Sequence, residues 1–195
     1  MKITVYNLKG GVGKTDIALN LALTLDCGII TNEPFSPFEK VLEDDRFIKL
    51  EHSEELDVLP DGYNIIFDFG GYVDKRVISA LKQSQCVIVP VVNEFKDVYT
   101  TINFLQEIED YNEKIVVVIN KTRRNDFEEA KKVFNEHYPD YPVIEIKYSR
   151  AFPNIMKEKK SIKAMVESGG LMAYSYRAVA KQFDTLIQTI KGIIS

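Results

Sequence analysis

The sequence is poor in the residues that mark several large classes of protein. Its 195 residues include only two cysteines, two histidines and no tryptophan. Cys27 and Cys86 form no C-x-x-C pair, which excludes a disulfide scaffold, although a single bridge between them stays open. No apolar run approaches the length needed to span a bilayer. The first residues soon turn polar and glycine-rich, unlike a secretory signal, and we expect a cytoplasmic protein.

The chain also has no overall excess of basic residues. It contains 25 Lys and Arg against 29 Asp and Glu, for a net charge of −4. The distribution is uneven, because residues 147–195 hold nine Lys and Arg against three Asp and Glu. A basic final quarter on an acidic body indicates a face for an anionic partner. The 45% hydrophobic content is that of one globular domain, residues 1–195, with its own core.

Short apolar runs alternate with segments of helical periodicity along the chain. The expected strands are 3–6, 28–31, 63–67, 86–92, 115–119 and 143–146, with a short edge strand at 47–51. The expected helices are 15–25, 36–43, 74–83, 98–111, 126–137, 161–167 and 174–194. Several strands are continuously apolar, as strands covered on both faces of a parallel sheet require. The pattern predicts an α/β fold with a doubly wound, mostly parallel sheet flanked by helices.

The segment KGGVGKT lies between the first expected strand and the first expected helix. Gly10, Gly11 and Gly13 allow backbone N–H groups to converge on phosphate oxygens, and the helix that follows adds its positive dipole end. Lys14 is placed to neutralise the β- and γ-phosphates, and the Thr15 hydroxyl to ligate Mg²⁺. The strand–loop–helix context indicates a phosphate-binding loop of P-loop NTPase type.

The loop departs from the common pattern G-x-x-x-x-G-K-[ST], because Leu8 stands at its first glycine and Lys9 is an additional lysine. K-G-G-x-G-K-T resembles the deviant Walker A motif of the ParA/MinD ATPases, closest to the small ParA-type partition proteins. The resemblance implies an ATP- and Mg²⁺-dependent nucleotide-sandwich dimer in which Lys9 reaches the partner's phosphates. The nucleotide-binding residues that it implies are Lys9, Gly10, Gly11, Val12, Gly13, Lys14, Thr15, Asp16 and Asn120.

The resemblance continues beyond the loop. YNIIFDFGG is similar to the family's Walker B strand, which makes Asp68 a carboxylate that holds Mg²⁺. IVVVINKTRR is similar to the strand whose terminal asparagine contacts adenine, so Asn120 is either a base-reading residue or a helix or turn cap. The catalytic residues would be Lys9, Lys14, Glu33 and Asp68.

Two departures from the family pattern concern catalysis. The segment TNEPF puts Thr31 and Glu33 where the family commonly has D-x-D-P, whose second Asp helps to position the attacking water. Glu33 keeps the carboxylate on a longer arm, so we expect slow, partner-stimulated ATP hydrolysis. Asp16 replaces the usual second threonine and adds a negative charge beside the phosphates.

The basic final quarter has two interpretations. Lys157, Lys160 and Lys163 recur at i, i+3 and i+6, and Arg177 and Lys181 at i and i+4, which indicates basic helix faces. Such faces either contact DNA phosphates non-specifically, as the resemblance favours, or are simply solvated. The resemblance also implies a ParB-like, centromere-binding partner and a nucleoid-associated protein that segregates plasmids or chromosomes.

Alternative functions receive less support. A MinD-like membrane helix would carry several basic residues on its polar face, but Lys191 is the only one in DTLIQTIKGIIS. A metabolic ATP-dependent enzyme would need its own acid–base residues, and His52 and His137 lie in no recognisable constellation. A GTPase would need a carboxylate where Arg123 stands after Asn120-Lys121, so adenine is favoured. The short chain also resembles partition ATPases without an N-terminal operator-binding domain.

Overall fold

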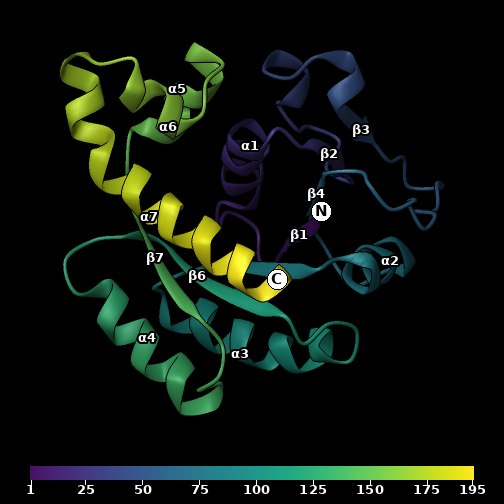
Figure 1. The fold of residues 1–195 in the computed structure, drawn as a ribbon. Helices are drawn as coiled ribbons and strands as arrows, with labels where there is room; N and C mark the ends of the chain where they lie inside the picture. The colour runs from purple at the N-terminus through teal and green to yellow at the C-terminus, as the bar shows by residue number, and fades with distance from the viewer.

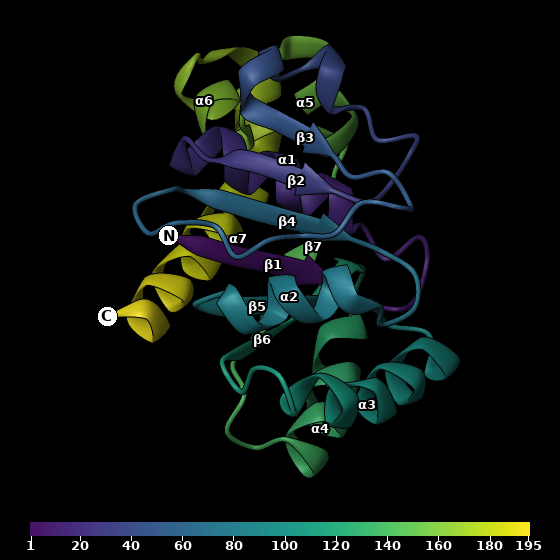
Figure 2. The same cartoon turned by 90° about the vertical axis from the view of Figure 1, so that its right-hand side faces the viewer.

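Seven parallel strands form one sheet in the order β3-β2-β4-β1-β5-β6-β7. In this computed structural model, which describes residues 1–195, the strands are β1 (Lys2–Tyr6), β2 (Gly28–Thr31), β3 (Phe47–Lys49), β4 (Ile65–Phe69), β5 (Cys86–Val92), β6 (Ile115–Thr122) and β7 (Val143–Lys147). Figure 2 shows β3, β2, β4 and β1 one below another, with their arrowheads pointing the same way. This confirms the predicted doubly wound α/β fold. The carboxyl ends of all strands therefore meet at one edge of the sheet.

Seven α-helices cover the two faces of the sheet (Figure 1). They are α1 (Lys14–Leu25), α2 (Lys75–Gln83), α3 (Phe95–Glu109), α4 (Asp126–His137), α5 (Ala151–Glu158), α6 (Ile162–Glu167) and α7 (Gly170–Ile194). One apolar cluster joins the sheet to α1, α5, α6 and α7, and a second joins its other face to α2, α3 and α4. The sheet is thus the middle layer of three.

Strand β6 shows why the central runs are apolar throughout. Val116 and Val118 belong to the first cluster, whereas Val117 and Ile119 belong to the second. Successive side chains of a strand point to opposite faces, so a strand covered on both sides must be apolar at every position. All four side chains are completely buried.

The predicted helix at 36–43 is wrong. The chain there forms two 3₁₀ turns, Phe38–Lys40 and Asp44–Arg46, and the intervening Leu42 N–H donates to the Phe38 carbonyl at 2.8 Å. The segment is short, and three successive acids, Glu43 to Asp45, would face the negative end of such a helix. Burial of Phe38 and Leu42 fixes the first of the two turns instead.

Other differences concern boundaries. Strand β4 runs two residues further than predicted and includes Asp68, because its ladder with β1 continues to the pair Tyr6 and Phe69. Helix α3 starts one turn earlier than predicted and α7 starts at Gly170. Helix α5 was not among the predicted helices. The edge strand β3 is confirmed, in a shorter form.

The two cysteines are buried and free, so the bridge that the sequence left open is not formed. Burial raises the pKa of the Cys27 thiol to about 11 and that of Cys86 to about 12. Both thiols are therefore poor nucleophiles at neutral pH. None of the helices combines the length and the apolar character needed to cross a lipid bilayer.

The long helix α7 provides a test of the packing. Phe183 is 3% exposed and meets Phe152 edge to face, with ring centroids 5.9 Å apart. We expect Phe183→Ala to lower the free energy of unfolding by about 3–5 kcal/mol, because it leaves a cavity between α7 and α5. Urea denaturation measures the change, with the exposed Gln188→Ala as control. A loss no larger than that of the control would contradict the described packing of α7.

Candidate functional site

The glycine-rich loop joins β1 to α1 at the carboxyl edge of the sheet. Gly13 is the N-cap of α1 with φ +92°, and Gly11 has φ +79°, conformations that favour glycine. No side chain caps this end of the 12-residue helix. Its first N–H groups and its positive dipole end therefore face the loop, an arrangement that suits an anion.

Lys14 is the first residue of α1 and is 8% exposed. Its Nζ donates to the Lys9 carbonyl at 3.2 Å. Burial lowers the pKa of this amine, while the carboxylates of Asp68 and Glu33 act in the opposite direction. The ammonium group is thus held inside the loop, close to two acids.

Asp68, near the end of β4, is completely buried beside the loop. The Thr15 hydroxyl donates to its Oδ2 at 2.9 Å, while its Oδ1 has no hydrogen-bond partner. Burial raises the pKa of this carboxyl to about 7, against the opposing effects of Thr15 and Lys14. A hydroxyl next to a buried carboxylate that has one oxygen free fits the oxygen ligands that Mg²⁺ prefers.

The segment after β2 lies against the segment after β4. Asn32 forms two hydrogen bonds with Gly70: its Nδ2 donates to the Gly70 carbonyl and its Oδ1 accepts from the Gly70 N–H, both at 2.9 Å. A Cβ at Gly70 would collide with the Glu33 carboxylate and lie 3.4 Å from Cε of Lys14. Glu33 therefore lies close to Gly70 and Lys14, and its catalytic role stays a prediction. Asn32 is a supporting residue that the sequence did not indicate.

Lys9 forms an ion pair within its own chain. Its Nζ lies 2.9 Å from Oδ1 of Asp97, in the first turn of α3. The Lys9 side chain is 37% exposed and that of Asp97 is 6% exposed. The hydrogen bond and the charge of Asp97 raise the pKa of Lys9. Nothing in the local sequence pattern pointed to Asp97, which is 88 positions away along the chain.

Asn120, near the end of β6, is 1% exposed and contacts the loop backbone. Its Nδ2 donates to the Val12 carbonyl at 2.8 Å, and its Oδ1 accepts from the N–H of Lys121. Lys121 in turn donates from Nζ to the Gly11 carbonyl at 2.7 Å. Lys121 also opposes the burial that raises the pKa of Asp16. The adenine contact of Asn120 stays a prediction.

A hollow of about 530 Å³ opens beside Lys9, Gly10 and Gly11. The ends of β5, β6 and β7 complete its wall, where the Arg123 guanidinium lies 4.7 Å from the ring centroid of Tyr148. This volume lies in the range of small-molecule sites. The hollow adjoins the loop at the edge where ligands of open α/β sheets bind.

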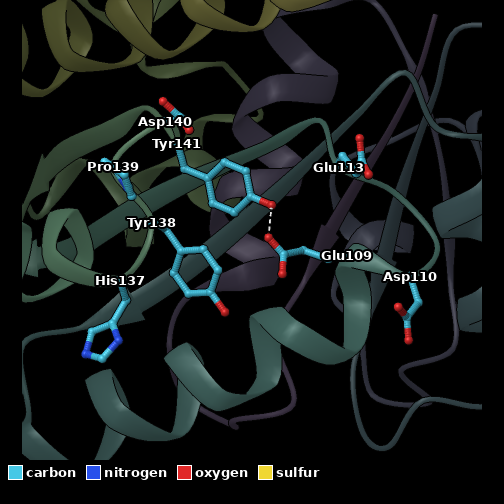
Figure 3. Close-up of a pocket in the computed structure, with 8 residues that line it drawn as sticks. All are labelled: Glu109, Asp110, Glu113, His137, Tyr138, Pro139, Asp140 and Tyr141. Atoms are coloured by element: carbon cyan, nitrogen blue, oxygen red, sulfur yellow. Dashed lines mark hydrogen bonds between the residues drawn. The ribbon is translucent and has the colours of Figure 1, made fainter.

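A second hollow, of about 760 Å³, lies near the amino ends of β6 and β7, and Figure 3 shows its lining residues. It is lined by Glu109, Asp110, Glu113, His137, Tyr138, Pro139, Asp140 and Tyr141. The rings of Tyr138 and Tyr141 stack at 5.2 Å, and the Tyr141 hydroxyl donates to Glu109. Its four carboxyl groups face no lysine or arginine and would repel phosphate, so this hollow does not suit a nucleotide. The hollow beside the loop also has three acids, Glu94, Asp97 and Asp126, but Lys9, Lys121 and Arg123 offset their charge.

The predicted DNA-binding residues are all exposed, but they do not share one helix. Lys157 lies on α5 and Lys163 on α6, and the left-handed Lys159, with φ +52°, ends α5 between them. The helical i, i+3, i+6 spacing of Lys157, Lys160 and Lys163 is therefore broken. Arg177 and Lys181 do share α7, and α5, α6 and the start of α7 gather at one end of the molecule (Figure 1).

Similar structures establish the fold. The McdA–ATP complex of Cyanothece has a TM-score of 0.69 and 14% identity over 98% of this chain and 96% of its own. MinD of Pyrococcus horikoshii, in complex with Mg-ADP, has a TM-score of 0.65 and 15% identity over 96% of this chain and 97% of its own. A putative plasmid partition protein of Borrelia burgdorferi, bound to AMPPNP, has a TM-score of 0.60 and 16% identity over 95% of this chain and 98% of its own. No family model and no curated protein sequence matches the chain. The chain thus has the fold of the McdA, MinD and ParA-type ATPases.

The raised pKa of Asp68 predicts a pH-dependent stability in the absence of nucleotide and Mg²⁺. The folded protein keeps this proton up to about pH 7, whereas an unfolded Asp loses it near pH 4. Between these values the unfolded state binds fewer protons, so stability falls as pH rises. Asp68→Asn cannot ionise and should be more stable than the wild type at pH 8, by about 2–4 kcal/mol.

Urea titrations at several pH values measure this difference. It should shrink toward zero below pH 4, where the carboxyl is protonated in both states of the wild-type protein. Asp61→Asn, at an exposed position, serves as the control and should follow the wild type at every pH. A constant difference between Asp68→Asn and the wild type across the whole range would contradict the raised pKa.

Proposed function

We propose that this protein is an ATP-switched partition or positioning ATPase that dimerises around bound nucleotide and binds DNA non-specifically in its ATP state. One observation carries the proposal: the hydrogen-bonded Thr15–Asp68 pair, with its carboxylate buried, lies beside Lys14 at the start of an uncapped helix, with a second lysine, Lys9, on the same loop. The fold shared with the McdA, MinD and ParA-type ATPases supports it.

The site residues have chemistry that suits a magnesium nucleotide. The N–H groups of the loop and the Lys14 ammonium would bind the phosphate oxygens. Thr15 and Asp68 would hold Mg²⁺, Asp68 most simply through water, because the cation keeps several waters in such sites. Bound Mg²⁺ supplies neutralisation of phosphate charge. Arg123 and Tyr148 line the hollow next to the loop, where the adenine would lie, and Asn120 contacts the loop backbone at Val12.

The chain's own contribution to hydrolysis would be positioning and charge stabilisation. Glu33 lies close to Gly70 and Lys14, where its carboxylate could orient a water toward the terminal phosphate. Its longer arm, compared with the aspartate of the family, supports slow turnover. A ParB-like partner would then increase the rate by ordering this segment.

Lys9 would provide the link between the two subunits. Its side chain is partly exposed, so it could reach a second copy once it leaves Asp97. In the proposed dimer it neutralises charge on the partner's phosphates. DNA contact through Lys157, Lys160, Lys163, Arg177 and Lys181 would tie the ATP-bound dimer to the nucleoid and drive segregation of a plasmid, chromosome or other cargo.

Substitution of the two loop lysines should affect different steps, nucleotide binding for Lys14 and dimerisation for Lys9. Lys14→Ala removes the buried ammonium and should abolish detectable ADP–Mg²⁺ binding, a loss of about a hundredfold or more. Lys9→Ala should bind ADP about as well as the wild type but should stay monomeric with a non-hydrolysable ATP analogue. Calorimetry and analytical ultracentrifugation make the two measurements, with the exposed Lys75→Ala as control. A Lys9→Ala protein that dimerises normally would contradict the proposed nucleotide-sandwich dimer.

DNA binding should depend on the nucleotide and on salt. With ATP–Mg²⁺ the protein should bind arbitrary duplex DNA, with an affinity that falls steeply as salt rises, and with ADP–Mg²⁺ it should bind weakly. Charge reversal of Lys157, Lys160 and Lys163 to Glu should weaken this binding about tenfold or more at low salt. Fluorescence anisotropy at several salt concentrations provides the measurement.

The matched control reverses three exposed lysines elsewhere, Lys75, Lys114 and Lys132. Equal losses in the two triple variants would show only a general effect of net charge. Absence of DNA binding in both nucleotide states would exclude DNA as the surface on which the protein acts. A lipid surface or a protein partner would then be tested instead.

A further inference from the structure

Two neighbouring side chains of β6 donate to two neighbouring carbonyls of the glycine-rich loop. Asn120 Nδ2 donates to the Val12 carbonyl at 2.8 Å, and Lys121 Nζ donates to the Gly11 carbonyl at 2.7 Å. Both contacts join segments more than 100 residues apart in the sequence. The first is buried, whereas Lys121 is exposed. They form a two-point contact between β6 and the loop, which we call the β6 clamp.

The backbone of β6 is irregular where the clamp begins. Along a regular strand, adjacent side chains point to opposite faces, so Asn120 and Lys121 could not both reach the loop. The pairing of β6 with β7 shifts register between Asn120 and Thr122, and Lys121 has φ +58° in the left-handed region. A bulge re-aims a side chain in this way. The left-handed conformation is uncommon for a lysine, and here it accompanies the loop contact.

We propose that the β6 clamp sets the orientation of the loop peptides that bind phosphate, with Asn120 and Lys121 as positioning residues. In a trans peptide the C=O of one residue and the N–H of the next point in opposite directions. Carbonyls of Gly11 and Val12 held toward β6 turn the N–H groups of Val12 and Gly13 away from β6, into the loop. The inference rests on the proposed function, because it assumes that the loop binds phosphate.

The packing around Gly13 supports the same assignment. A Cβ at this position would collide with the Asn120 side-chain amide and would lie 3.6 Å from Cε of Lys121. The loop therefore passes so close to the clamp that only glycine fits, in addition to its φ of +92°. Lys121 is also the cation that acts on Asp16, so the clamp partly offsets the acid that replaces the family's threonine.

The test separates a phosphate-loop role from a base-reading role. The variants are Lys121→Gly, which keeps the left-handed backbone but removes the ammonium, and Asn120→Asp, which keeps the shape but cannot donate to Val12. The probes are ADP, GDP and inorganic pyrophosphate, each with Mg²⁺. We expect both variants to weaken binding of all three probes by a similar factor, about tenfold.

Lys121→Arg, which keeps a cationic donor, should stay within about threefold of the wild type. Lys159→Gly is the matched control, since it changes another left-handed lysine far from the loop, and its affinities should not change. Thermal unfolding should show Lys121→Gly to be at least as stable as the wild type, because glycine readily adopts a positive φ.

The possible outcomes are distinct. Wild-type affinity of Lys121→Gly for all three probes would overturn the clamp while leaving the proposed function intact. Loss of affinity for ADP alone would also overturn it and would assign these residues to base recognition. A wild-type protein that binds none of the probes would overturn the proposed function, and the clamp with it.

Discussion

The position of β1 between β4 and β5 is the constraint on which the site depends. Helix α1 connects β1 to β2 across one face of the sheet, and helix α2 connects β4 to β5 across the other face. The loop that leaves β1 therefore lies at the crevice where strand order reverses, the place where open α/β sheets bind ligands. The register completes the arrangement, because Asp68 is paired with Val5 of β1 and Thr31 of β2.

The same register also explains why oppositely charged groups gather there. Asp68 is held in the sheet by the pairing of β4, and the Thr15 hydroxyl, in the first turn of α1, donates a hydrogen bond to it. Lys14 is buried next to it, and each of these two groups favours the charged form of the other. Burial nevertheless dominates both, so the amine has a lowered pKa and the acid a raised one. A ligand that brings both an anion and a divalent cation, as the proposed function requires, would relieve this imbalance.

The sequence was sufficient to predict those parts of the site whose chemistry is local. The loop motif and the acid at the end of an apolar strand lie in contiguous segments, and parallel strands bring them to one edge. The Lys9–Asp97 pair and the β6 clamp could not be predicted. The first joins distant segments, and the second depends on a bulge that has no clear sequence signature. The left-handed Lys159 likewise breaks a spacing that looked continuous.

The Lys9–Asp97 pair has an energetic consequence for a switch of the proposed kind. If Lys9 moves to a partner's phosphates, Asp97 is left as a carboxylate that is only 6% exposed. An unpaired buried charge is unfavourable, so the new contact must offset that loss before a dimer gains stability. A nucleotide with more phosphate charge at the interface offers Lys9 a stronger alternative than one with less. Competition between an internal acid and a partner's phosphates would therefore make dimerisation depend on which nucleotide is bound, without any movement of the sheet.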